Sequence, residues 1–111
     1  MTPRFDWQNM PIAHGKSVVG LILRRKLGAR GQADVVTLDV WQRFGTYHQR
    51  VERPIIGADF TFFPLSHLPR GRFLYAFRLG GKTIASWHFI NPAPCKTYYG
   101  YEQPPCPPSP K

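Results

Sequence analysis

The stretch that decides the fold is FLYAFRLGGKTIASWHF, residues 73–89. Two apolar and aromatic runs flank Gly80-Gly81, and a Gly-Gly pair predicts a two-residue turn, since glycine readily adopts the positive φ angles of such turns. The stretch therefore predicts a β-hairpin. It also carries Arg78 and Lys82 beside the turn, and these charges are either solvated or face a negatively charged partner.

The expected pairing sorts the side chains of this hairpin onto two faces. A two-residue loop pairs Leu79 with Lys82 and Phe77 with Ile84. The face predicted to enter the core carries Phe73, Tyr75, Phe77, Leu79 and Ile84, although Ser86 and His88 also fall along it. The other face carries Leu74, Ala76, Arg78, Thr83, Ala85 and Trp87. On this second face Trp87 is either covered by another segment or offered to a partner.

Short strands are also expected before the hairpin, at residues 17–25, 35–44, 46–52 and 59–65. The second of them alternates clearly, because Val36, Leu38 and Val40 share one side, as is typical of a half-buried strand. Turn residues separate the segments, and none of them shows the period of a helix. Six short strands without a helix predict an all-β domain over residues 17–90, either a sandwich or a small barrel.

Residues 63–90, FPLSHLPRGRFLYAFRLGGKTIASWHFI, add a resemblance in fold. Their order of turn, glycine, aromatic strand, glycine turn and strand resembles the closing hairpin of an immunoglobulin-like or fibronectin-like sandwich. The resemblance implies a small immunoglobulin-like β-sandwich, with a small β-barrel as the alternative. No Cys-Trp-Cys pattern accompanies it, so it concerns the fold and names no family.

Both ends of the chain are expected to lie outside the domain. Residues 1–16 predict an extended arm, because prolines and glycine interrupt regular structure, and its anchors Phe5 and Trp7 pack either on the domain or on a neighbouring subunit. Residues 91–111 hold seven of the twelve prolines and predict a polyproline-like or coil tail. Three tyrosines in this tail favour docking on a partner over a solvated coil: Tyr98, Tyr99 and Tyr101.

The charge of the chain is strongly one-sided. There are 15 Lys and Arg against 6 Asp and Glu, a formal net charge of +9, and ten of the cations are Arg. The arginine fork matches phosphate and carboxylate groups, and its planar face stacks on aromatic rings. The composition therefore predicts an acidic partner, which is an acidic protein surface, a larger protein assembly or a nucleic acid. Arg24 and Arg25 end the first strand and are expected, with Arg78 and Lys82, to meet this partner.

The familiar motifs of catalysis are missing from the sequence. It contains no G-x-S-x-G nucleophile elbow, no phosphate-binding G-x-x-x-x-G-K-[ST] loop and no dinucleotide fingerprint. No histidine lies at metal-ligand spacing beside Cys95 or Cys106, and these two cysteines form either a disulfide or two free thiols. We therefore expect a protein that is not an enzyme and that holds no metal or cofactor.

The sequence also bears on location. The longest apolar run, residues 18–23, is far shorter than the roughly 20 residues of a membrane span. The first residues show no long apolar core of the kind found in secretory signals. We therefore expect no membrane partner, and a location in the cytoplasm or in a virion-like assembly.

Together these observations predict a non-enzymatic protein-protein interaction or assembly module with a basic surface. The residues expected to bind the partner are Phe5, Trp7, Arg24, Arg25, Arg78, Lys82, Trp87, Tyr98, Tyr99 and Tyr101. The alternative is a nucleic-acid-binding β-barrel that uses arginine and exposed aromatic residues. The size and style of the chain suggest an accessory protein of a phage or mobile element, which decorates or adapts a capsid or inhibits a host complex.

Overall fold

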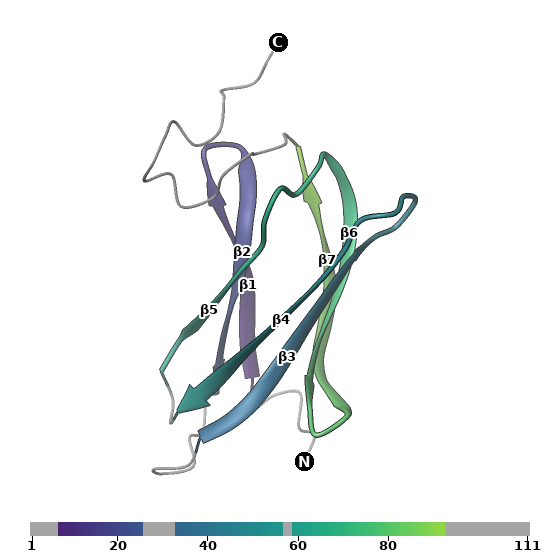
Figure 1. Cartoon of the computed structure of the whole chain (residues 1–111). Coiled ribbons are helices and arrows are strands. Elements are labelled where there is room, and N and C mark those ends of the chain that lie inside the picture. Colours follow the sequence, from purple (N-terminus) through teal and green to yellow (C-terminus); the bar gives the residue numbers. More distant parts are fainter. Residues whose placement is uncertain (1–6, 26–32, 57–58, 93–111) are drawn as a thin grey trace.

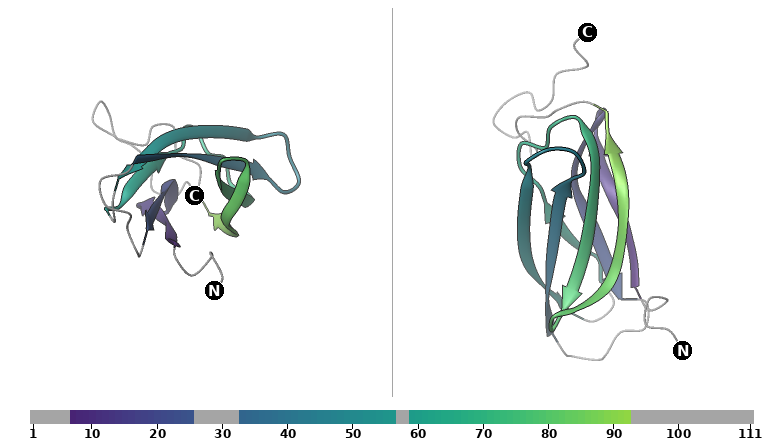
Figure 2. Two further views of the ribbon diagram at one scale, coloured as in Figure 1. Left: turned by 90° about the horizontal axis from the view of Figure 1, so that it is seen from below. Right: turned by 90° about the vertical axis from the view of Figure 1, so that its right-hand side faces the viewer.

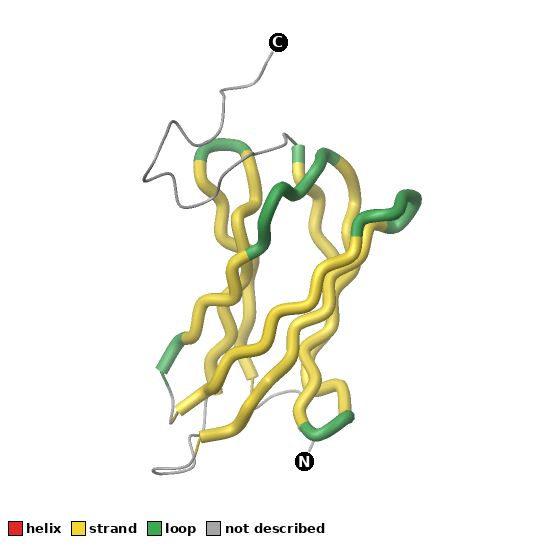
Figure 3. Tube along the Cα trace, in the orientation of Figure 1, coloured by secondary structure: helices red, strands yellow, loops and turns green. Residues whose placement is uncertain are grey.

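The computed structural model describes residues 7–25, 33–56 and 59–92, and these ranges form seven β-strands (Figure 1). The strands are β1 (Trp7–His14), β2 (Ser17–Arg25), β3 (Ala33–Gln42), β4 (His48–Ile56), β5 (Thr61–Pro64), β6 (Gly71–Leu79) and β7 (Lys82–Asn91). The described ranges contain strands and loops but no helix (Figure 3). The all-β prediction is therefore confirmed.

The strands form two antiparallel sheets that pack as two layers (Figure 2). The first sheet has the order β1-β2-β5 and the second the order β4-β3-β6-β7. Each sheet keeps two edge strands, so the strands do not close into a ring. The alternative of a closed small barrel is therefore wrong, and the domain is a β-sandwich.

The core lies between the two layers and follows the alternation of the strands. Val36, Leu38 and Val40 of β3 have no exposed surface, as their alternation predicts. The neighbouring strand β6 contributes three aromatic side chains to the same core: Phe73, Tyr75 and Phe77. The first sheet completes the core with Leu21, Leu23 and Phe63. Phe63 meets Phe77 edge to face across the layers, with ring centroids 5.1 Å apart.

The β6–β7 hairpin differs from its expected register by one residue. Leu79 pairs with Lys82 as predicted, but Phe77 pairs with Ala85, because Ile84 is the extra residue of a β-bulge. Beyond the bulge the two faces of β7 are exchanged relative to the prediction. Ser86 and His88 therefore belong to the outer face, and the expected outer positions of Ala85 and Trp87 are wrong: they lie opposite Phe77 and Tyr75.

The prediction that residues 1–16 lie outside the domain is wrong for β1. Trp7–His14 pairs along its whole length with β2, from Trp7 opposite Arg25 to His14 opposite Ser17. Pro11 is compatible with β1 because β1 is the edge of its sheet, and the outward side of an edge strand forms no ladder hydrogen bonds. Phe5 lies outside the described residues.

Strand β4 is longer than residues 46–52, the range expected from the sequence. It continues through Pro54, which lies opposite Val35, to Ile56. The reason is the same as for β1, since β4 is an edge strand and its outer side pairs with no neighbour in the second sheet. β5 is shorter than expected and ends at Pro64.

The expected tail, residues 91–111, begins one residue too early. Asn91 is the last residue of β7 and is fully buried. Its Oδ1 accepts a hydrogen bond of 2.7 Å from the N–H of Val18, and its Nδ2 donates to the carbonyls of Leu68 and Pro69. This amide joins β7, β2 and the loop before β6. The rest of the tail from residue 93, with Tyr98, Tyr99, Tyr101 and both cysteines, lies outside the described residues.

Candidate functional site

The outer face of the second sheet collects the charged and aromatic side chains that face away from the core. The register aligns them in rows across four strands. We call this surface the outer face, and its members are Thr37, Asp39, Trp41, Arg43, His48, Arg50, Glu52, Arg72, Leu74, Ala76, Arg78, Thr83, Ser86, His88 and Ile90. Each lies at a position that alternates with the buried residues of its strand, apart from Thr83, which precedes the bulge, and Arg43, which follows the end of β3.

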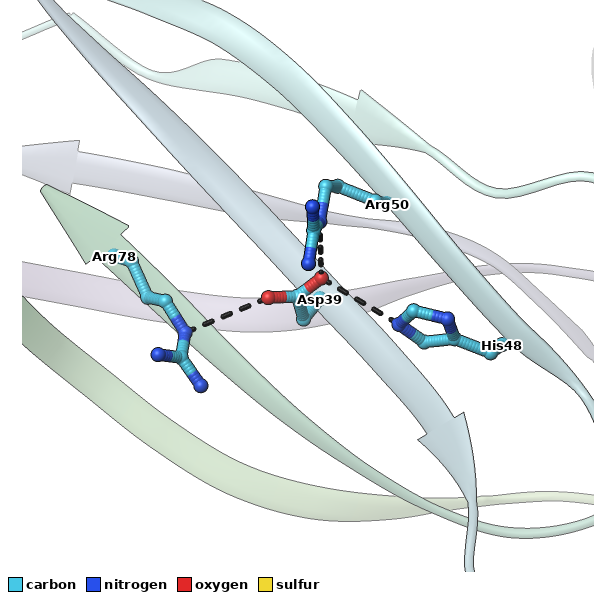
Figure 4. Close-up of polar contacts among 4 residues, drawn as sticks. All are labelled: Asp39, His48, Arg50 and Arg78. Carbon is cyan, nitrogen blue, oxygen red and sulfur yellow. Dashed lines mark hydrogen bonds and ion pairs between the residues drawn. The ribbon is translucent and has the colours of Figure 1, made fainter. Parts of the chain in front are cut away.

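A buried carboxylate lies near the middle of the outer face, with two arginines and a histidine around it (Figure 4). Asp39 is only 6% exposed. Its Oδ1 accepts a hydrogen bond of 2.8 Å from Nε of Arg50, and its Oδ2 lies 3.4 Å from Nε of Arg78. His48 places Nε2 3.5 Å from the same carboxylate. The hydrogen bond and charge of Asp39 raise the pKa of the exposed Arg50 above its ordinary value.

This arrangement holds two arginines through their Nε atoms and leaves their terminal Nη donors unused. Arg50 and Arg78 each turn Nε toward Asp39, from the two strands on either side of β3 (Figure 4). Within the described part of the chain, their terminal Nη atoms have no hydrogen-bond partner. Asp39 therefore holds the guanidinium groups against the sheet, and the unused N–H donors remain available for an oxyanion.

A groove runs beside Arg78 on the same face and has aromatic walls. Its volume is about 440 Å³, and Trp41, Trp87 and His88 are among the residues that line it. Trp87 takes an inner position, opposite Tyr75, but β7 is an edge strand, and the indole is 64% exposed. The indole stacks on the ring of His88, with ring centroids 4.8 Å apart and ring planes inclined by 28°. Leu74 and Ala76 also line the groove, from the outer side of β6. The groove therefore offers flat aromatic surfaces next to a fixed cation.

Two further arginines lie at the other end of the groove. Arg72 lies two residues before Leu74, near the start of β6. Arg43 comes two residues after Trp41, just beyond the end of β3. The backbone N–H of Arg43 donates to the carbonyl of Arg72 at 2.9 Å, which keeps these two residues adjacent. Both side chains are exposed. Arg78 and Arg72 thus bracket the groove along β6, whereas the guanidinium of Arg43 lies over the Phe44 ring, 4.9 Å from its centroid.

The outer face carries more positive than negative charge. Its arginines are Arg43, Arg50, Arg72 and Arg78, and its carboxylates are Asp39 and Glu52. Asp39 is buried beneath its ion pairs, so Glu52 is the exposed acid of this face. A partner that approaches the face therefore meets a surface of mainly positive potential.

Three of the residues expected to bind a partner lie on this side of the molecule. Arg78 belongs to the outer face, Trp87 lines its groove, and Lys82 is exposed at the turn between β6 and β7. The structure brings Arg78 and Trp87 together at one groove. Phe5, Tyr98, Tyr99 and Tyr101 lie outside the described residues.

Three other expected residues lie on the first sheet. Arg25 is buried at 6% exposure, forms an ion pair with Asp34, and holds its guanidinium over the half-buried Trp7 ring at 5.0 Å. This packing leaves Arg25 and Trp7 out of the candidate site. Arg24 is half-buried, with its guanidinium 5.1 Å from the Phe60 ring, on a different surface from the outer face.

Sequence reasoning missed Asp39, Trp41, Arg50 and His88 as parts of one site. One signal was present, because the alternation of residues 35–44 places Asp39 and Trp41 on the same polar side of a strand. The neighbours across the sheet could not be found without the order β4-β3-β6-β7. The position of His88 depends in addition on the bulge.

The described ranges show neither a metal site nor a membrane helix. In residues 7–25, 33–56 and 59–92, no three His, Cys, Asp or Glu side chains gather where they could hold a metal ion. No helix long and apolar enough to cross a membrane occurs in these ranges.

Comparison with known proteins assigns no family to this chain. No protein-family model, no curated protein and no solved structure matches it. The outer face itself is therefore the basis on which a function is proposed.

Proposed function

We propose that this protein is a non-enzymatic binding module that attaches to an acidic partner through the outer face, as an interaction or assembly component. One observation carries the proposal: Arg50 and Arg78 are held over a buried carboxylate and keep their Nη donors unused. Fixed arginines lose less side-chain entropy when they bind an oxyanion, so the arrangement favours recognition over a merely solvated surface.

The proposal is tested by binding to two polyanions, single-stranded DNA and poly-L-glutamate, across a salt series. The variant Arg72→Glu/Arg78→Glu reverses charge at both ends of the groove. The control Lys16→Glu/Arg24→Glu makes the same change of net charge on the side of the first sheet. We expect the first variant to weaken binding about tenfold more than the control at about 0.15 M salt, because local contacts exceed the general attraction of the net charge.

The two charge variants separate a defined site from a diffuse charge effect. Equal losses in both would mean that the net charge of +9 attracts polyanions without a site, which contradicts the proposal. Binding of neither polyanion by the unaltered protein would contradict it as well. Circular dichroism of both variants verifies that the sandwich is retained.

We also propose that the sandwich is of the immunoglobulin-like type, in its fibronectin-like arrangement. The division into β1-β2-β5 and β4-β3-β6-β7 supports this proposal. So do the three hairpins within a sheet and the crossings between layers after β2, β4 and β5. A crystal structure with a different strand order would overturn it.

A further inference from the structure

We infer that the acidic partner is a single-stranded nucleic acid, whose bases stack in the aromatic groove while its phosphates meet the bracketing arginines. The inference rests on the proposed function, since it names the class of partner for the same outer face. It is carried by the combination of stacking surfaces and fixed cations, which is the arrangement that single-strand binders use.

Two aromatic residues of the groove lie in one row, with Leu74 between them. The register places Trp41, Leu74 and His88 in one row across β3, β6 and β7. Because adjacent strands lie about 4.8 Å apart, the backbones of Trp41 and His88 are about 10 Å from each other. Trp87 stacks on His88 and extends that wall. A base can therefore lie against either wall above Leu74.

The arginines lie where a nucleic-acid backbone would pass. Arg72 and Arg78 are both on the outer side of β6, six residues apart, which corresponds to about 20 Å along the strand. Leu74 and Ala76, which line the groove, lie between them. A strand of nucleic acid laid along β6 would thus contact cations at both ends and aromatic surfaces between them.

An acidic peptide or a DNA duplex fits this face less well. Carboxylates would pair with the arginines but would leave the exposed Trp87 without a planar partner. A duplex offers its phosphates but keeps its bases stacked inside, so it cannot use the aromatic walls. The exposed bases of a single strand use both features of the face.

The test is fluorescence anisotropy with a labelled oligothymidylate of about 12 nucleotides, a length within the range of known single-strand sites. The variants are Trp41→Leu and Trp87→Leu, with Trp87→Phe to retain an aromatic ring. Phe60→Leu is the matched control, because Phe60 is an exposed aromatic residue, at 57% exposure, on the side of the first sheet. Thermal unfolding verifies that each variant is folded.

We expect Trp87→Leu and Trp41→Leu each to weaken oligothymidylate binding about tenfold, since stacking of one base contributes that order of affinity. Trp87→Phe should stay within about threefold of the unaltered protein, and Phe60→Leu should not change binding. Poly-L-glutamate binding should be insensitive to all four changes. This pattern separates stacking from charge.

Two results would overturn the inference and leave the proposed function standing. One is unchanged oligothymidylate binding in both tryptophan variants while Arg72→Glu/Arg78→Glu still weakens it. The other is tighter binding of poly-L-glutamate, or of duplex DNA, than of oligothymidylate at the same salt concentration. The failure of every polyanion to bind would instead overturn the proposed function itself.

Discussion

Asn91 is the residue that joins the two layers at one end of the sandwich. Its amide accepts from the N–H of Val18 and donates to two loop carbonyls, all at a fully buried position. We expect Asn91→Ala to lower the free energy of unfolding by about 2–4 kcal/mol, because it leaves buried polar groups without partners. Urea denaturation measures the change, and the exposed neighbour Ile90→Ala is the control, expected within about 0.5 kcal/mol. Equal small changes in both variants would contradict a stabilising role of the Asn91 amide.

One buried and one half-buried phenol make stability depend on alkaline pH. Burial raises the pKa of Tyr47 and of Tyr75 from 10.0 to about 12. Between these values the unfolded chain has lost protons that the folded chain retains, so the stability that is complete below pH 10 falls as pH rises toward 12. Denaturation midpoints across this range measure the fall, and Tyr47→Phe should reduce it. Titration of all five tyrosines together near pH 10 would contradict the prediction.

At the scale of elements, β2 and β5 meet closely at Gly20. A Cβ built at this position would lie 2.5 Å from the carbonyl oxygen of Phe63 and 2.6 Å from the Phe62 ring. Since the backbone of β5 must shift to make room, we expect Gly20→Ala to destabilise the protein by about 1–3 kcal/mol. Thermal unfolding measures the loss, with the exposed His14→Ala as control. An unchanged melting temperature would mean that β5 adapts freely.

The elements also show what the sequence could predict. The alternation of β3 and the Gly80-Gly81 turn correctly predict buried residues and a hairpin, because both signals are local. β1 and the end of β4 were missed because each contains a proline. A proline argues against a central strand but not against an edge strand, and edges are defined only by the final strand order.

The bulge in β7 was hidden for a different reason. A two-residue turn fixes the first pair of a hairpin, Leu79 with Lys82, but a single extra residue further along exchanges the two faces. Ile84 is expected in the core with a regular register and is also buried in the bulged strand. Its hydrophobic character therefore does not indicate the bulge. The outward position of His88, and with it one wall of the groove, could not be derived from the sequence.

At the scale of the whole molecule, the net charge can be read from the sequence, but the place where the charges gather cannot. The excess of arginine leads us to expect an acidic partner, and Arg78 and Trp87 are among the residues expected to meet it. Arg25 was also expected there but is buried against Asp34 and Trp7. The difference arises because a net charge is a property of the chain, whereas a binding face requires residues from β3, β4, β6 and β7 to be brought together by the sheet.

The most direct measurement is an NMR titration of the isotope-labelled protein with the oligothymidylate, following each backbone amide. We expect shifts that concentrate on β3, β6 and β7 around Trp41, Leu74 and His88, and that fade as salt rises because phosphate contacts release counterions. The amides of β1, β2 and β5 should remain unchanged. Shifts confined to the first sheet, or spread evenly over both layers, would contradict the assignment of the outer face as the binding surface.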